Sequence, residues 1–155
     1  MPSFPKQEIE AAHDRYVKTR ERIAKGELGW NALADFFTED ATFIDPAWGR
    51  VEGREAIREF FTMSMAGLDG WSFPHEWRMI DGDRVVASWQ NRLPGAGEDG
   101  KPYQAHGLTV MIYAGGGKFS FEEDLLNMVH VLELIIESGW KPSEAVNMPP
   151  PNPRR

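Results

Sequence analysis

The hydrophobic residues of this 155-residue chain change their spacing once, and this change restricts the fold more than any other feature. Up to Met65 they recur at intervals of three and four, which predicts helices over about 6–25, 28–37 and 54–65. From Trp71 onward they alternate with polar residues, which is the spacing of strands with one apolar face. Helices followed by a run of strands are typical of an α+β domain.

The second half of the chain predicts strands over 71–79, 85–93, 103–113 and 118–124. Asp81-Gly82-Asp83 and Gly115-Gly116-Gly117 supply turns between them. A last helix follows, closed by Gly139 and Pro142. We therefore expect a curved antiparallel sheet wrapped around a helix in a single domain over 1–147, followed by a disordered Pro-rich tail over 148–155.

The stretch from Asp40 to Phe61 carries the first chemical signal. It predicts a short strand, a tight turn, a few extended residues and then a helix. Asp45 ends the strand, and Pro46 favours an extended backbone at Asp45. Because its neighbours are apolar, the Asp45 carboxylate is a candidate proton carrier. The alternative is an ordinary aspartate that caps its own turn.

The same stretch resembles a known family. Its run Asp-Ala-Thr-x-x-Asp-Pro-x-x-Gly, followed by Gly-Arg-Glu-Ala-Ile-Arg-Glu-Phe, is similar to a segment of the ketosteroid isomerases. These belong to the NTF2-like superfamily, together with SnoaL-like polyketide cyclases and limonene epoxide hydrolases. The resemblance implies an NTF2-like cone, in which the sheet wraps the N-terminal helices and an extra C-terminal helix follows. It also implies that Asp45 is the general base and Tyr16 stabilises an oxyanion.

The resemblance leaves the second acid open. The isomerases use a protonated aspartate at the position that Thr109 occupies here, and threonine is a weaker donor. SnoaL-like cyclases use an acidic residue late on the last strand with a histidine on the preceding strand, which implies Glu122 or Asp124 with His106. Alternation puts His106 and Thr109 on opposite faces, so both face the cavity only if a bulge intervenes. The alternative for Glu122-Glu123-Asp124 is a solvated acidic strand end and helix N-cap, where the helix dipole favours carboxylates.

Composition excludes several other classes of protein. A net charge of −7 disfavours nucleic acid, and the absence of cysteine excludes thiolate chemistry. The sequence has no secretion signal, membrane-length apolar run, metal-ligand spacing, phosphate loop or serine nucleophile motif. We therefore expect a cytoplasmic protein without metal or cofactor.

Three functions fit these features. The first is an isomerase, cyclase or lyase that moves protons on a small apolar carbonyl or aromatic, polycyclic compound. The second is a non-catalytic binder of such a compound, and the third is a dimeric interaction domain. We expect a homodimer, because the long strands carry more apolar area than one helix covers. The predicted cavity lining is Trp48, Phe61, His75, Trp77, Trp89, Asn91, Thr109, Met111 and Leu126. His75 is alternatively a core histidine.

Overall fold

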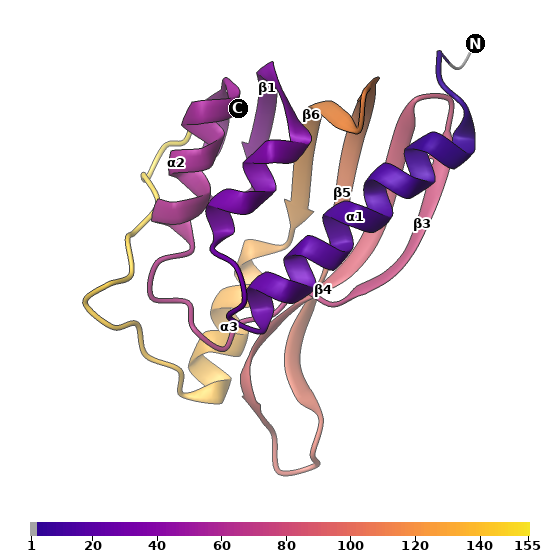
Figure 1. Ribbon diagram of the computed structural model, residues 1–155. Coiled ribbons are helices and arrows are strands. Elements are labelled where there is room, and N and C mark those ends of the chain that lie inside the picture. The colour runs from indigo at the N-terminus through magenta and orange to yellow at the C-terminus, as the bar shows by residue number, and fades with distance from the viewer. Residues whose placement is uncertain (1–2) are drawn as a thin grey trace.

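A computed structural model describes residues 3–155 of the protein (Figure 1). Met1 and Pro2, which the predicted domain includes, lie outside the described residues. The elements are α1 (Lys6–Ala24), the 3₁₀ helix η1 (Trp30–Phe36), β1 (Phe37–Asp45), β2 (Gly49–Glu52), α2 (Arg54–Ser64), β3 (His75–Asp81), β4 (Arg84–Ala96), β5 (Pro102–Gly115), β6 (Lys118–Leu126) and α3 (Met128–Ser138).

The six strands form one curved sheet in the order β2-β1-β6-β5-β4-β3 (Figure 1). All neighbours are antiparallel except β1 and β6, which pair in parallel. Helix α1 crosses one face of the sheet, α2 lies beside β1, and α3 contacts β4 and β5. The predicted α+β architecture, with N-terminal helices in the curve of the sheet and an added C-terminal helix, is confirmed.

Two separate clusters of buried side chains form the core. The larger lies between the sheet and the N-terminal helices and includes Ile9, Leu33, Phe37 and Phe119. The smaller lies under α3 and includes Trp71, Leu93, Ala105, Val131 and Leu134. Side chains from both clusters border one cavity. The fold therefore leaves an apolar space between its two cores.

The first half of the sheet differs from the prediction in detail. β1 begins at Phe37 rather than near Ala41, and the extended residues after the turn form the strand β2. The second predicted helix is a 3₁₀ helix of 7 residues. Phe37, predicted as its end, instead starts β1 and is completely buried.

A bulge in β3 overturns the facing predicted for Trp77. The register of β3 against β4 shifts between His75 and Trp77, so that Trp77 pairs with Ser88 on the outer face of the sheet. The side chain of Arg78 points inward instead, where it bonds to Asp14 and lies 3.3 Å from Nδ1 of His13 on α1.

The chain after α3 contains no helix or strand as far as Arg155. It runs from α3 along α2 to the turn between β1 and β2, where the C-terminus lies (Figure 1). Within the described residues, 3–155, no helix is long and apolar enough to cross a membrane.

Candidate active site

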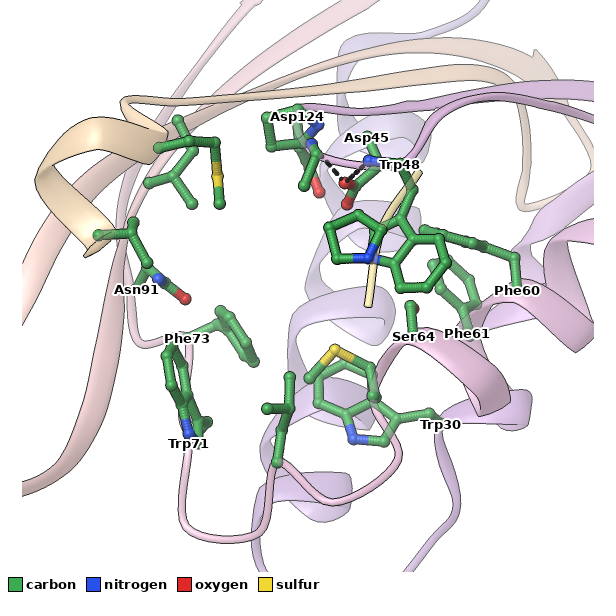
Figure 2. A pocket seen from close by; sticks show the side chains of 18 of the residues that line it. Trp30, Asp45, Trp48, Phe60, Phe61, Ser64, Trp71, Phe73, Asn91 and Asp124 are labelled. Carbon is green, nitrogen blue, oxygen red and sulfur yellow. Dashed lines mark hydrogen bonds between the residues drawn. The ribbon is translucent and has the colours of Figure 1, made fainter. Parts of the chain in front are cut away.

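The cavity between the two cores has a volume of about 410 Å³ and an aromatic lining (Figure 2). Its polar side chains are few. Three carboxylates, Asp45, Glu122 and Asp124, border it together with Arg20 and Asn91. The aromatic residues around it are Tyr16, Trp30, Phe43, Trp48, Phe60, Phe61, Trp71, Phe73, Trp89 and Trp140. An apolar pocket with a few convergent polar groups is the usual form of a small-molecule site.

Asp45 lies at the end of β1, where Pro46 starts the turn to β2. Its Oδ1 accepts hydrogen bonds from the backbone N–H groups of Ala47 at 2.7 Å and Trp48 at 2.8 Å (Figure 2). The carboxylate therefore caps its own turn and also borders the cavity. Burial raises the pKa of Asp45, while the two backbone hydrogen bonds and the charge of Arg155 oppose this rise.

Asp124 is held by a hydrogen-bond chain from the sheet. Thr109 Oγ1 donates to Asp124 Oδ1 at 2.5 Å, and Trp89 Nε1 donates to Thr109 Oγ1 at 2.8 Å. Burial raises the pKa of Asp124 to about 7, the Thr109 hydrogen bond lowers it, and the charge of Asp45 raises it. Asp124 is thus divided between its acid and carboxylate forms near neutral pH.

Glu122 is the most deeply buried of the three carboxyl groups, with 2% of its surface exposed. Tyr16 donates its hydroxyl to Glu122 Oε1 at 3.0 Å, while Oε2 is buried without a partner. Burial, followed by the charge of Asp124, raises the pKa of Glu122 well above its usual range. Because a buried ionised oxygen without a partner is costly, this environment favours the protonated form of Glu122.

The Tyr16 hydroxyl therefore donates its hydrogen bond to Glu122. Its ring is buried in the larger core cluster and edges the cavity, and its pKa is raised by burial and by Glu122. The guanidinium of Arg20, one turn along α1, lies 6.0 Å from the Tyr16 ring centroid. Arg20 also borders the cavity, where its charge lowers the pKa values of Glu122 and Asp124. Sequence reasoning missed Arg20, although its helical spacing from Tyr16 places it on the same face.

Five predicted lining residues border the cavity, namely Trp48, Phe61, Trp89, Asn91 and Leu126. The side chain of Asn91 points into the open space, with 4% of its surface exposed (Figure 2). Sequence reasoning missed Trp30, Trp71 and Phe73 as lining residues. Trp71 and Phe73 lie in the predicted strand over 71–79, so the alternation of that strand was a usable signal for them.

His106 and Trp77 lie outside the cavity, contrary to the prediction. The β5 register continues without a bulge from His106 to Thr109, so the two side chains take opposite faces. The His106 side chain is 55% exposed and its Nε2 lies 2.6 Å from Ser88 Oγ on the outer face. Trp77 is 46% exposed on that face because of the β3 bulge.

The remaining three predicted lining residues also lie apart from the cavity. His75 packs under α1, with its ring centroid 5.4 Å from that of His13. Met111 is completely buried in the larger core cluster. Thr109 faces the interior as expected, but it reaches the cavity only through its hydrogen bond to Asp124.

An open, curved sheet that encloses helices and an apolar cavity defines the NTF2-like class of proteins. The sequence profile of the SnoaL-like domain matches residues 15–120, and the chain belongs to this family. The matched range includes α1 from Arg15 onward, the β1–β2 turn with Asp45, and all of β3, β4 and β5. The comparison with curated proteins returned no match.

Solved structures of the same fold include three with informative names. A protein from Shewanella putrefaciens CN-32, described as a SnoaL-like polyketide cyclase, has a TM-score of 0.65 and 18% identity, over 87% of this chain and 88% of that one. A Catenulispora acidiphila DSM 44928 protein with a ketosteroid isomerase-like fold, in complex with trimethylamine, has a TM-score of 0.60 and 23% identity. The match covers 81% of this chain and 97% of that one. SalBIII, an epoxide hydrolase/cyclase-like enzyme of salinomycin pyran ring formation, has a TM-score of 0.59 and 17% identity. The match covers 81% of this chain and 95% of that one.

The position of Asp124 predicts a characteristic dependence of stability on pH. Its pKa of about 7 in the folded protein exceeds the value of about 3.9 for an unfolded chain. The stability that its proton confers is therefore complete below pH 3.9 and is lost as the pH rises through 7. We expect Asp124→Asn to melt at a higher temperature than the wild type at pH 8, with a gap that narrows as the pH falls toward 4. A gap that does not change with pH would contradict this assignment.

Proposed function

We propose that this protein is a cofactor-independent enzyme that transfers protons on a small apolar carbonyl or aromatic compound. Asp45 is the general base, and Asp124 in its protonated form donates to the oxygen of the substrate. One observation carries the proposal: two carboxyl groups with different partners border the same apolar cavity. Paired groups whose environments separate their pKa values are the basis of acid–base catalysis.

The surroundings of each carboxyl group fit its proposed role. Oδ1 of Asp45 receives two N–H groups, which favour the ionised form that a base needs. Asp124 has a pKa of about 7 and retains a proton in a substantial fraction of molecules at neutral pH. Thr109, at the position of the isomerases' protonated aspartate, donates to Asp124. The acid of this site is therefore moved one strand along, from β5 to β6.

The proposed reaction begins when Asp45 removes a proton from a carbon next to a carbonyl. The electron pair of that C–H bond forms a carbon–carbon double bond, and the carbonyl oxygen takes the proton of Asp124. In a substrate with a β,γ double bond, Asp45 returns its proton to the γ-carbon and the enol O–H returns its proton to Asp124, so the double bond moves into conjugation with the re-formed carbonyl. In ring closure, the enol carbon attacks a second carbonyl, whose oxygen takes the proton held by Asp45, while the enol O–H returns its proton to Asp124. In elimination, a group on the β-carbon leaves with the proton held by Asp45, and the enol O–H again returns its proton to Asp124.

Glu122, in its protonated form, and Tyr16 bind each other at the edge of the cavity and do not exchange protons with the substrate. The Tyr16 hydroxyl already donates to Glu122, so Asp124 supplies the proton that the substrate oxygen needs. The names of similar structures, which include cyclases and an isomerase-like fold with a bound small molecule, support a small-molecule site.

We also propose that residues 1–147 form one domain and that the protein is cytoplasmic.

The second candidate function is a non-catalytic binder of the same class of compound. The density of aromatic rings around the cavity favours it, because such a lining binds a planar molecule without any proton transfer. The binder and the enzyme differ in whether Asp45 moves a proton, so one exchange experiment separates them.

We expect the protein to catalyse exchange of the α-hydrogens of 2-tetralone in D₂O, followed by NMR. Asp45→Asn retains the shape of the side chain and loses the base, so protein-dependent exchange should fall by about 100-fold or more. Asp40→Asn is the matched control, since Asp40 is exposed on the same strand and bonds only to Thr38 within residues 3–155. Equal exchange by wild type and Asp45→Asn would show that Asp45 is not the base.

We further propose a homodimer that pairs through the outer face of the sheet. Trp77, Met79 and Leu125 are large apolar residues exposed on that face or at its edge. Exposed apolar area of this kind marks an interaction surface, and an identical copy is the simplest partner.

Sedimentation at micromolar concentration should therefore give a dimer, and Trp77→Glu should give a folded monomer, because it places a charge in the apolar interface. Met63→Glu, on α2 and away from the sheet, is the control and should leave the dimer intact. A wild-type monomer at these concentrations would contradict the proposal.

A further inference from the structure

The chain that follows α3 forms one wall of the cavity. Trp140, Pro142, Val146, Asn147, Met148 and Pro149 all border it, although this stretch contains no helix or strand. The other walls come from α1, η1, α2, α3 and the sheet. Residues 140–149 therefore close a space that the helices and strands leave open on this side.

Contacts with α2 hold the middle of this wall. Asn147 Nδ2 donates to the backbone carbonyl of Met63 at 2.9 Å, at the C-terminal end of α2. Val146 packs against Gly67, where an added Cβ would lie 2.7 Å from Val146 Cγ2. Gly67 also has a positive φ of 77°, so the position suits glycine both for its backbone angle and for this close approach.

The end of the chain is attached to the turn that carries Asp45. The carbonyl of Arg154 accepts a hydrogen bond from the backbone N–H of Arg50 at 2.6 Å. The guanidinium of Arg155 donates to the carbonyls of Asp45 and Pro46, each at 2.8 Å. These carbonyls belong to the same turn whose N–H groups bind the Asp45 carboxylate. Arg155 therefore fixes the turn from outside, and its charge favours the ionised form of Asp45.

We infer that residues 140–155 are a working part of the binding site, in which 140–149 limit the size and residence time of the ligand and Arg155 is a positioning residue for Asp45. The second half of this inference rests on the proposed function, and the first half does not. The proline-rich composition of 148–155 predicts disorder. The specific contacts at Asn147, Arg154 and Arg155 favour the alternative, in which the segment is held on the domain.

The first test is amide hydrogen exchange at Arg50 in the full chain, followed by NMR. Arg155→Gln removes the hydrogen bonds of the guanidinium to the carbonyls of Asp45 and Pro46. The Arg50 N–H should then be separated from the Arg154 carbonyl for more of the time and exchange several-fold faster. Arg154→Gln is the matched control. It makes the same charge change one residue away, where the side chain meets only the exposed Glu52 at 3.3 Å among the residues described. Equal exchange in the wild type and Arg155→Gln would overturn the attachment.

The second test measures ligand residence with 2-naphthol, a neutral planar probe, by stopped-flow tryptophan fluorescence. The double variant Asn147→Ala/Arg155→Gln removes the side-chain hydrogen bonds that attach residues 140–155 to Met63 and to the Asp45 turn, without changing the sheet. We expect 2-naphthol to dissociate about tenfold faster from this variant than from Arg154→Gln, because the lost hydrogen bonds hold residues 140–155 on the domain. Unchanged dissociation would overturn the role of the wall, whether or not the protein is an enzyme.

The third test reads the positioning role through the pKa of Asp45, measured from its ¹³C carboxyl shift. Arg155→Gln removes a nearby positive charge and should raise this pKa. Arg155→Lys keeps the charge and should restore the wild-type value, even though it cannot donate to both carbonyls with the same fork geometry. An Asp45 pKa that is identical in all three proteins would show that Arg155 does not position Asp45. The role of residues 140–149 in ligand residence would still be decided by the other two tests.

Discussion

The parallel pairing of β1 with β6 is the interaction on which the candidate site depends. It aligns Phe43 with Glu122 and Ile44 with Glu123, so that the end of β1 reaches the acidic run of β6. Asp45, from the first third of the chain, thereby comes close enough for its charge to raise the pKa of Asp124. Without this pairing, Asp45 would lie apart from Glu122 and Asp124.

Burial raises the pKa of all three carboxyl groups, but each group has different hydrogen-bond partners. Two backbone N–H groups serve Asp45, one threonine hydroxyl serves Asp124, and Glu122 receives a single tyrosine hydroxyl with its second oxygen unpartnered. The more donors a buried carboxylate receives, the less its charge costs. The number of hydrogen bonds therefore distinguishes the environments of the three carboxyl groups.

Much of this arrangement could be predicted from local sequence. Alternation along β6 puts Glu122 and Asp124 on one face, and Asp45-Pro46 marks a strand end beside a turn. The conflict between His106 and Thr109 was also visible, because a regular strand cannot point both inward. The uninterrupted register of β5 resolves it in favour of Thr109.

The features that could not be predicted depend on contacts between distant residues. The β3 bulge that turns Trp77 outward accompanies the contact of Arg78 with α1, and hydrophobic alternation carries no sign of it. The parallel pairing of β1 with β6 joins segments some eighty residues apart. The segment after α3 has the composition of a flexible tail, and its attachments to Met63, to Arg50 and to the Asp45 turn distinguish it from one.

The central claim is that neighbouring carboxyl groups on one apolar cavity are held in different protonation states. A ¹³C NMR titration of the side-chain carboxyl groups of the wild-type protein tests it directly. At neutral pH we expect an ionised Asp45, a protonated Glu122 and an Asp124 that titrates with a pKa of about 7. Three carboxyl groups that all titrate near the ordinary value of about 4 would contradict it.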